Sequence, residues 1–190
     1  MKRVLFLAIA FLLSITASAQ TEHLKFKGIP IDGDFKAFAQ KLVQKGFKQV
    51  EATPDGIILT GTFMATPGVT VVVYPDPSTK AVSAVAAMIE AGDNWSDIEE
   101  KYDNVIATYK EKYGEPSEQV KEFTTDVHND DFFRKNALRE GQCDYRTLWE
   151  PEGGRILISL VFFQFKYYVV CTYADEQNLK ALRKSIIDDI

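Results

Sequence analysis

The sequence predicts an α+β fold: an antiparallel sheet of about eight strands in two helix-plus-four-strand halves, with helices packed on one face. Three observations predict it. Segments rich in β-branched and aromatic residues recur between turns that contain Gly, Pro or Asp. Two stretches with helical spacing of apolar residues, 34–45 and 95–113, precede these segments. The order helix, short strand and three longer strands occurs from 34 to 90 and again from 95 to 174, so the halves of one domain, 20–190, lie at about 33–92 and 93–190.

The least polar part of the mature chain, Arg155–Tyr173, is predicted to form two buried strands. Its β-branched and aromatic residues favour a pleated surface, and Arg155, Gln164 and Lys166 argue against a membrane helix. A single strand of this length would extend about 60 Å at ~3.3 Å per residue, so the chain must reverse near Gln164–Lys166. Tight turns usually contain Gly or Asn, and this one has neither. Phe165 is therefore expected to be an exposed turn residue.

The remaining elements follow from local patterns. The helices have residues typical of caps at their ends: Asp32 or Asp34 and Gly46 for the first, Asn94 or Ser96 and Gly114 for the second, and Asp175 before a third. One or two helical turns are expected within 124–141. The expected strands are an edge strand at 23–31, then 47–51, 57–64, 69–74, 80–90, 119–123, 143–150, 155–164 and 167–174, with a turn at Thr66–Gly68 and Val69–Tyr74 buried on both sides.

The N-terminus predicts export. Lys2 and Arg3 precede an apolar run that ends near Ile15, and small residues follow it up to Ala19. This pattern is typical of a secretory signal peptide, residues 1–19, with cleavage near Ala19. The mature protein is therefore expected to be periplasmic or secreted, with no membrane span.

Charge and cysteine content limit the partners. Of 190 residues, 27 are acidic and 22 basic, and removal of Lys2 and Arg3 leaves 20 basic side chains and a formal charge of −7. Such a surface repels phosphate backbones, so nucleic acid is not expected as a partner. Cys143 and Cys171 form an even pair, which suggests a disulfide in an oxidising compartment. A meander of 143–150, 155–164 and 167–174 would instead separate them by two strand spacings, about 9.6 Å, so both states stay open.

Short motifs carry a family resemblance. The phrase Gly28-Ile29-Pro30-Ile31-Asp32-Gly33, followed by Lys45-Gly46-Phe47, resembles the opening of uncharacterised secreted proteins of Bacteroides-type bacteria. The later segments Tyr113-Gly114, Gly141-Gln142-Cys143 and Tyr173-Ala174-Asp175 fit the same group. The resemblance covers most of the mature chain and implies no established activity or site residues. The order of elements is similar to that of the β-lactamase inhibitor protein, which implies helices over one face of a long antiparallel sheet.

Candidate catalytic residues are few. A catalytic triad could use only His128, since His23 lies at the mature N-terminus, and no Gly-x-Ser-x-Gly elbow occurs. The oxygen-rich run from Asp126 to Asp131 lacks the central Gly and closing Glu of a calcium loop. We therefore expect no metal and no cofactor. Paired carboxylates cannot be located from sequence, so a carboxylate-dependent hydrolase of the cell envelope is the alternative function.

The favoured function is a non-enzymatic binding protein whose uncovered sheet face recognises a protein, peptide or glycan. The last strands carry more aromatic residues than one layer of helices is expected to bury, and exposed aromatic patches mark binding surfaces. The candidate binding residues are Tyr145, Trp149, Phe163, Phe165 and Tyr167.

Overall fold

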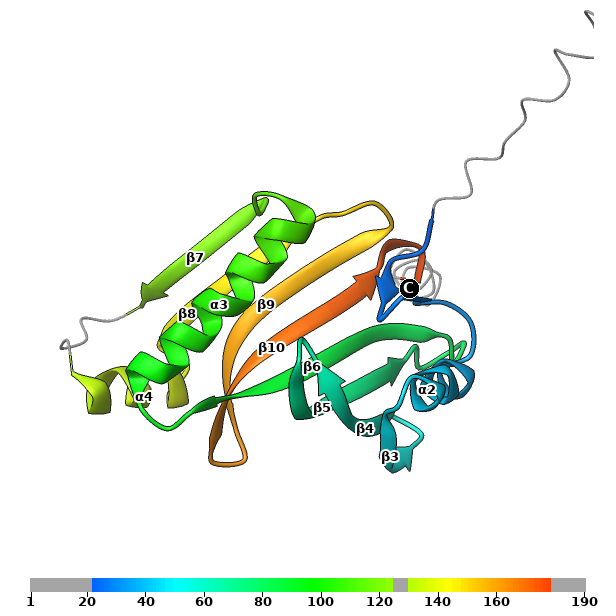
Figure 1. Cartoon of the computed structure of the whole chain (residues 1–190), viewed down its shortest axis with the longest axis horizontal. Helices are drawn as coiled ribbons and strands as arrows, with labels where there is room; N and C mark the ends of the chain where they lie inside the picture. The colour runs from blue at the N-terminus through cyan, green and yellow to red at the C-terminus, as the bar shows by residue number, and fades with distance from the viewer. Residues whose placement is uncertain (1–21, 125–129, 179–190) are drawn as a thin grey trace, which may run out of the picture.

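The computed structural model describes residues 22–124 and 130–178 and confirms the α+β fold (Figure 1). Eight strands form an antiparallel sheet in the order β3-β4-β5-β6-β10-β9-β8-β7, so the last strand of each half lies at the centre. The strands are β3 (Lys48–Thr53), β4 (Gly56–Phe63), β5 (Thr66–Pro75), β6 (Val82–Gly92), β7 (Glu118–Phe123), β8 (Cys143–Trp149), β9 (Gly154–Phe163) and β10 (Lys166–Asp175).

The helices are α2 (Phe35–Gln44), α3 (Trp95–Tyr113) and α4 (Asp131–Arg139). Asp34 caps α2 by accepting hydrogen bonds from the N–H groups of Lys36 and Ala37, and Asn94 caps α3. The helical turns expected within 124–141 are α4. The third predicted helix begins at Glu176, and its residues after Asn178 lie outside the described ranges, as does the predicted signal peptide.

The helices bury one face of the sheet along its six inner strands. A cross-strand row runs through six neighbouring strands, and each of its side chains has 0% exposure: Leu59, Val71, Ala87, Cys171, Ile158 and Thr147. Facing residues in a sheet share a side, so this row defines the inner face. α2 packs against β4 and β5, and α3 packs against β6 and β10. Tyr102 of α3 hydrogen bonds to Thr147 Oγ1 at 2.7 Å, which satisfies the one polar residue of the row.

The N-terminal strand differs from the prediction. Residues 23–31 do not join the edge of the main sheet, whose outer strands are β3 and β7; they form a small hairpin of β1 (Lys25–Phe26) and β2 (Ile29–Pro30). The chain reverses at Lys27 and Gly28, which both have positive φ angles. The hairpin is fixed by Asp175, whose buried carboxylate accepts a hydrogen bond from the Leu24 N–H at 2.9 Å.

Two further predictions about the first half are wrong. The β4–β5 reversal occurs at Met64 and Ala65, with φ angles of 48° and 58°, and not at Thr66–Gly68. Val69–Tyr74 is buried on one side only, because Thr70 and Val72 are half-exposed and Tyr74 is 42% exposed. Val69, Val71 and Val73 therefore lie on the buried face of the sheet, and Val72 lies on the partly exposed face.

The two cysteines are free thiols. The meander β8-β9-β10 places Cys171 opposite Ile158 of β9, and Ile158 faces Thr147 of β8. A whole strand thus separates the cysteines, and the disulfide that the sequence left open does not form. Among the described residues, no helix is long and apolar enough to cross a membrane.

Candidate functional site

Three of the five predicted binding residues lie on the inner face. Tyr145, Trp149 and Tyr167 are 6%, 2% and 3% exposed, so they are core residues. The Trp149 Nε1–H donates to the Gly114 carbonyl at the end of α3, and the Tyr145 hydroxyl donates to Glu99 Oε1. The Trp149 and Tyr145 side chains therefore connect β8 to α3. Each ring is buried, and its polar atom still has a hydrogen-bond partner on the helix or at its end.

The other two predicted residues are exposed at the β9–β10 hairpin. Phe163 is 50% and Phe165 93% exposed. The reversal occurs at Gln164 and Phe165, as predicted, with φ angles of 47° and 62°. Lys166, beside the turn, pairs with Glu90 of β6 at 2.7 Å. The hairpin end is therefore tied to the sheet at its base, while the Phe165 ring projects into solvent.

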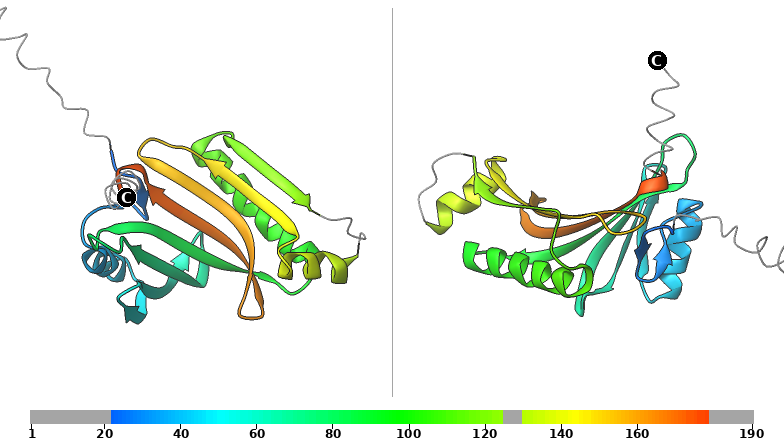
Figure 2. Two further views of the ribbon diagram at one scale, coloured as in Figure 1. Left: turned by 180° about the vertical axis from the view of Figure 1, so that it is seen from behind. Right: turned by 90° about the horizontal axis from the view of Figure 1, so that it is seen from above.

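The sheet face opposite the helices is apolar at its centre. Its first row contains Ile58, Val72, Ala86, Thr172, Leu157 and Leu148, and its second contains Thr60, Thr70, Met88, Val170, Ser159 and Arg146. Ala86 is buried, and the other eleven are partly exposed. In the described part of the chain no helix covers these rows, which we name the open face. Figure 2 shows, in its right panel, β9 and β10 bowed toward α3, so the open face lies on the hollow side of the bend.

One edge of the open face is acidic. The β7–β8 register places Glu118 and Glu122 on this face, opposite Leu148 and Asp144. Arg146, between them, pairs with Glu118 at 2.9 Å and also with Asp144. Glu118, Glu122 and Asp144 thus lie along this edge with a single guanidinium, which pairs with two of them, so the edge carries a local negative charge.

The described thiols and phenols are poorly suited to catalysis. Burial raises the pKa of Cys171 and of Cys143 to about 12 each, and that of Tyr102 to about 12. A thiol must lose its proton to act as a nucleophile. At neutral pH both cysteines therefore remain protonated and unreactive.

The carboxylates give no stronger indication of catalysis. A hollow beside Gly92 is lined by Glu90, Asp97 and Glu100, but Glu90 pairs with Lys166 and Asp97 accepts a hydrogen bond from Asn94 Nδ2. Within residues 22–124 and 130–178, no group of three His, Cys, Asp or Glu side chains could hold a metal ion.

The oxygen-rich run from Asp126 to Asp131 is only partly described. Asp126, His128 and Asn129 lie outside the described residues. Asp130 caps α4 by accepting from the Phe132 N–H, and Asp131 accepts from the Trp95 N–H and pairs with Lys135. Both described carboxylates therefore have structural partners.

The open-face rows are what sequence reasoning missed. The signal was present, since β5 and β9 have apolar residues at both alternating sets of positions. For Val69–Tyr74 that pattern predicts burial on both sides, whereas in both strands the second set is partly exposed. The candidate site is therefore the open face with the Phe163–Phe165 hairpin end and the acidic edge. No protein-family model, curated protein sequence or solved structure matches this chain.

Proposed function

We propose that the protein is a non-enzymatic binding protein, periplasmic or secreted after cleavage near Ala19, which recognises a peptide segment of a partner protein through the open face. The observation that carries this proposal is the apolar centre of that face. Contiguous apolar surface is uncommon on monomeric soluble proteins and marks interaction sites when it occurs. Leu148, Leu157, Val170 and Val72 supply such surface on four strands.

The residue types favour a peptide over a glycan. Sugar rings stack on exposed aromatic side chains, but neither row of the open face contains one. Tyr74 and Tyr168 lie two residues beyond the rows on the same face, while the rows themselves carry Ile, Val, Leu and Met among small polar residues. Apolar peptide side chains can fill the spaces between these residues. The acidic edge around Arg146 favours a partner with Lys or Arg beside its apolar residues, because complementary charges select partners and speed encounter.

The proposal can be tested with a displayed peptide library selected against the mature protein. We expect enriched peptides to combine apolar residues with Lys or Arg. Leu157→Glu should weaken their binding at least tenfold, since it buries a carboxylate among apolar groups. Val43→Glu is the matched control, because Val43 is 44% exposed on α2, away from the open face.

Methionine methyl NMR locates the binding. The chain contains three methionines, and only Met64 and Met88 lie in the mature part. Met88 belongs to the open face, so its methyl signal should shift when a selected peptide binds. A peptide that binds the Leu157→Glu variant as well as the wild type, or leaves the Met88 signal unchanged, contradicts the proposal.

A further inference from the structure

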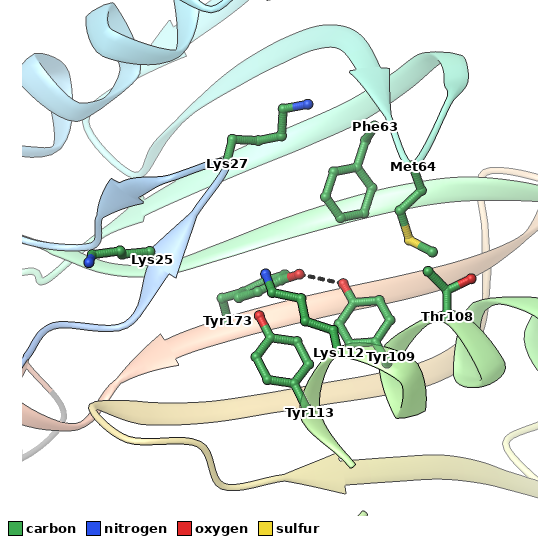
Figure 3. A pocket seen from close by; sticks show the side chains of 9 residues that line it. All are labelled: Lys25, Lys27, Phe63, Met64, Thr108, Tyr109, Lys112, Tyr113 and Tyr173. Atoms are coloured by element: carbon green, nitrogen blue, oxygen red, sulfur yellow. Dashed lines mark hydrogen bonds between the residues drawn. The ribbon is translucent and has the colours of Figure 1, made fainter. Parts of the chain in front are cut away.

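A small cavity opens on the helix side of the molecule, away from the open face. Its volume is about 140 Å³, and it lies between the β1–β2 hairpin, the β4–β5 turn and the last turns of α3 (Figure 3). Its lining comes from segments far apart in the chain: Lys25, Lys27, Phe63, Met64, Thr108, Tyr109, Lys112, Tyr113 and Tyr173.

The floor of the cavity is aromatic and uncharged. Tyr109 and Tyr173, 4% and 5% exposed, hydrogen bond to each other through their hydroxyl groups, and Tyr109 also contacts the Cys171 thiol. Burial raises the pKa of both phenols far above its ordinary value, so they stay neutral. Phe63, stacked on Phe26, forms a wall. The interior therefore suits a flat apolar group.

The mouth of the cavity is basic. Lys25 pairs with Glu22, but among the described residues no carboxylate pairs with Lys27 or Lys112. The Lys112 amine lies 4.8 Å from the centre of the Tyr113 ring, and Figure 3 shows the Lys27 side chain directed away from the two hydrogen-bonded phenols. None of the nine lining residues is acidic, although the chain as a whole has a formal charge of −5. Such a local excess of positive charge attracts anions.

Two lining residues occupy unfavourable backbone conformations. Lys27 and Met64 have φ angles of 53° and 48°, in the left-handed region that disfavours residues with a side chain. Each is the first residue of a hairpin turn, where Gly or Asn is the usual choice. Such conformations cluster at binding sites, and here both place a long side chain beside the cavity.

We propose that this cavity binds a small aromatic carboxylate, with its ring on the Tyr109–Tyr173 floor and its carboxylate at the ammonium group of Lys112. An apolar protein cavity of about 150 Å³ accommodates a benzene ring, so the volume suits one six-membered ring. The ring replaces water on an apolar surface, and Lys112 selects for negative charge. This site is distinct from the open face and does not depend on the proposed peptide binding.

The test titrates the mature protein with phenylacetate, and with benzylamine as the cationic probe of similar shape. Phenylacetate should bind with a Kd of about 0.1–1 mM, as expected for a ligand of this size. It should shift the methyl signal of Met64, which lines the cavity, and leave that of Met88 unchanged. Equal binding of benzylamine, or no saturable shift of Met64 with phenylacetate, overturns the proposal.

Variants with matched controls test the placement. Lys112→Gln should weaken phenylacetate binding about threefold, the size expected for one exposed charge pair, whereas Lys110→Gln, which removes the same charge nearby, should not.

Thr108→Phe should block the cavity, while Ala107→Phe, on the neighbouring exposed position of α3, should leave binding intact. Circular dichroism checks that each variant is folded. Unchanged affinity in a folded Thr108→Phe variant overturns the assignment.

Discussion

Asp76 shows how one buried carboxylate can organise a whole connection. It is 5% exposed and lies between β5 and β6. Its Oδ1 accepts hydrogen bonds from the Thr79 N–H at 2.7 Å, the Ser78 N–H at 2.9 Å and the Thr79 hydroxyl at 3.0 Å. These donors, led by the Thr79 N–H, lower the pKa of Asp76 below its ordinary value of 3.8. Hydrogen bonds to an ionised carboxylate stabilise the charged form.

This lowered pKa predicts a specific pH dependence of stability. A carboxyl group with a lower pKa in the folded state contributes its full stabilisation above its unfolded pKa, near 4, and loses it as pH falls through the folded pKa. Asp76→Asn should therefore lower the free energy of unfolding by about 1–2 kcal/mol at pH 7, and this difference from wild type should shrink below about pH 4. Urea unfolding at pH 7, 4 and 3 measures it.

The control for this prediction is Asp55→Asn. Asp55 is exposed in the β3–β4 turn, and the substitution should have little effect at any of the three pH values. A wild-type advantage over Asp76→Asn that stays constant down to pH 3 would show that the charge on Asp76 is not what stabilises the turn.

At the scale of elements, the β9–β10 hairpin combines an unfavourable turn with an exposed ring. Two-residue turns with positive φ at both positions are usually formed by Asn-Gly, whereas this turn contains Gln164 and Phe165. The pairing of Phe163 with Lys166 and of Tyr167 with Phe162 holds the strands together beside it. Packing along the strands therefore determines where the chain reverses, and the turn residues themselves oppose it.

Replacement of the turn by Gln164→Asn and Phe165→Gly should stabilise the protein. The expected gain is about 1 kcal/mol, because both new residues accept positive φ at lower cost. Urea unfolding of the double variant measures it. The single variant Phe165→Ala distinguishes the effect of the exposed ring from that of the backbone conformation. It removes the ring but keeps a residue with a side chain at positive φ, so it should give no comparable gain in stability. Equal stabilisation by both variants would contradict the backbone explanation.

Some features of these elements could be predicted from the sequence, and others could not. Caps at Asp34 and Asn94 and the reversal at Phe165 were predictable, because each depends on a few neighbouring residues. The side of a strand that faces a helix was not, because that depends on which element packs there. Tyr145 and Trp149 were therefore predicted on the binding face, but they lie on the side of β8 that α3 covers.

At the scale of the whole molecule, the two halves are interlocked. Their last strands, β6 and β10, pair at the centre of the sheet, from Gly92–Tyr167 to Ala84–Ala174. α3 belongs to the second half by sequence, yet it packs against β6 of the first half as well as β10. The repeated order of elements was visible in the sequence, but this exchange of contacts was not, since it arises only when the halves meet. The buried residues of the two halves form one continuous core.

This arrangement predicts a single cooperative unfolding transition for both halves. The two tryptophans, Trp95 and Trp149, report on the second half, and the Met64 methyl signal reports on the first. Both probes should give the same urea midpoint, because a shared core couples the halves. Val73→Ala, at a fully buried site in β5, should lower both midpoints together, with a loss of about 1–3 kcal/mol. A variant that moves the Met64 midpoint and leaves the tryptophan midpoint in place would show that the halves unfold independently.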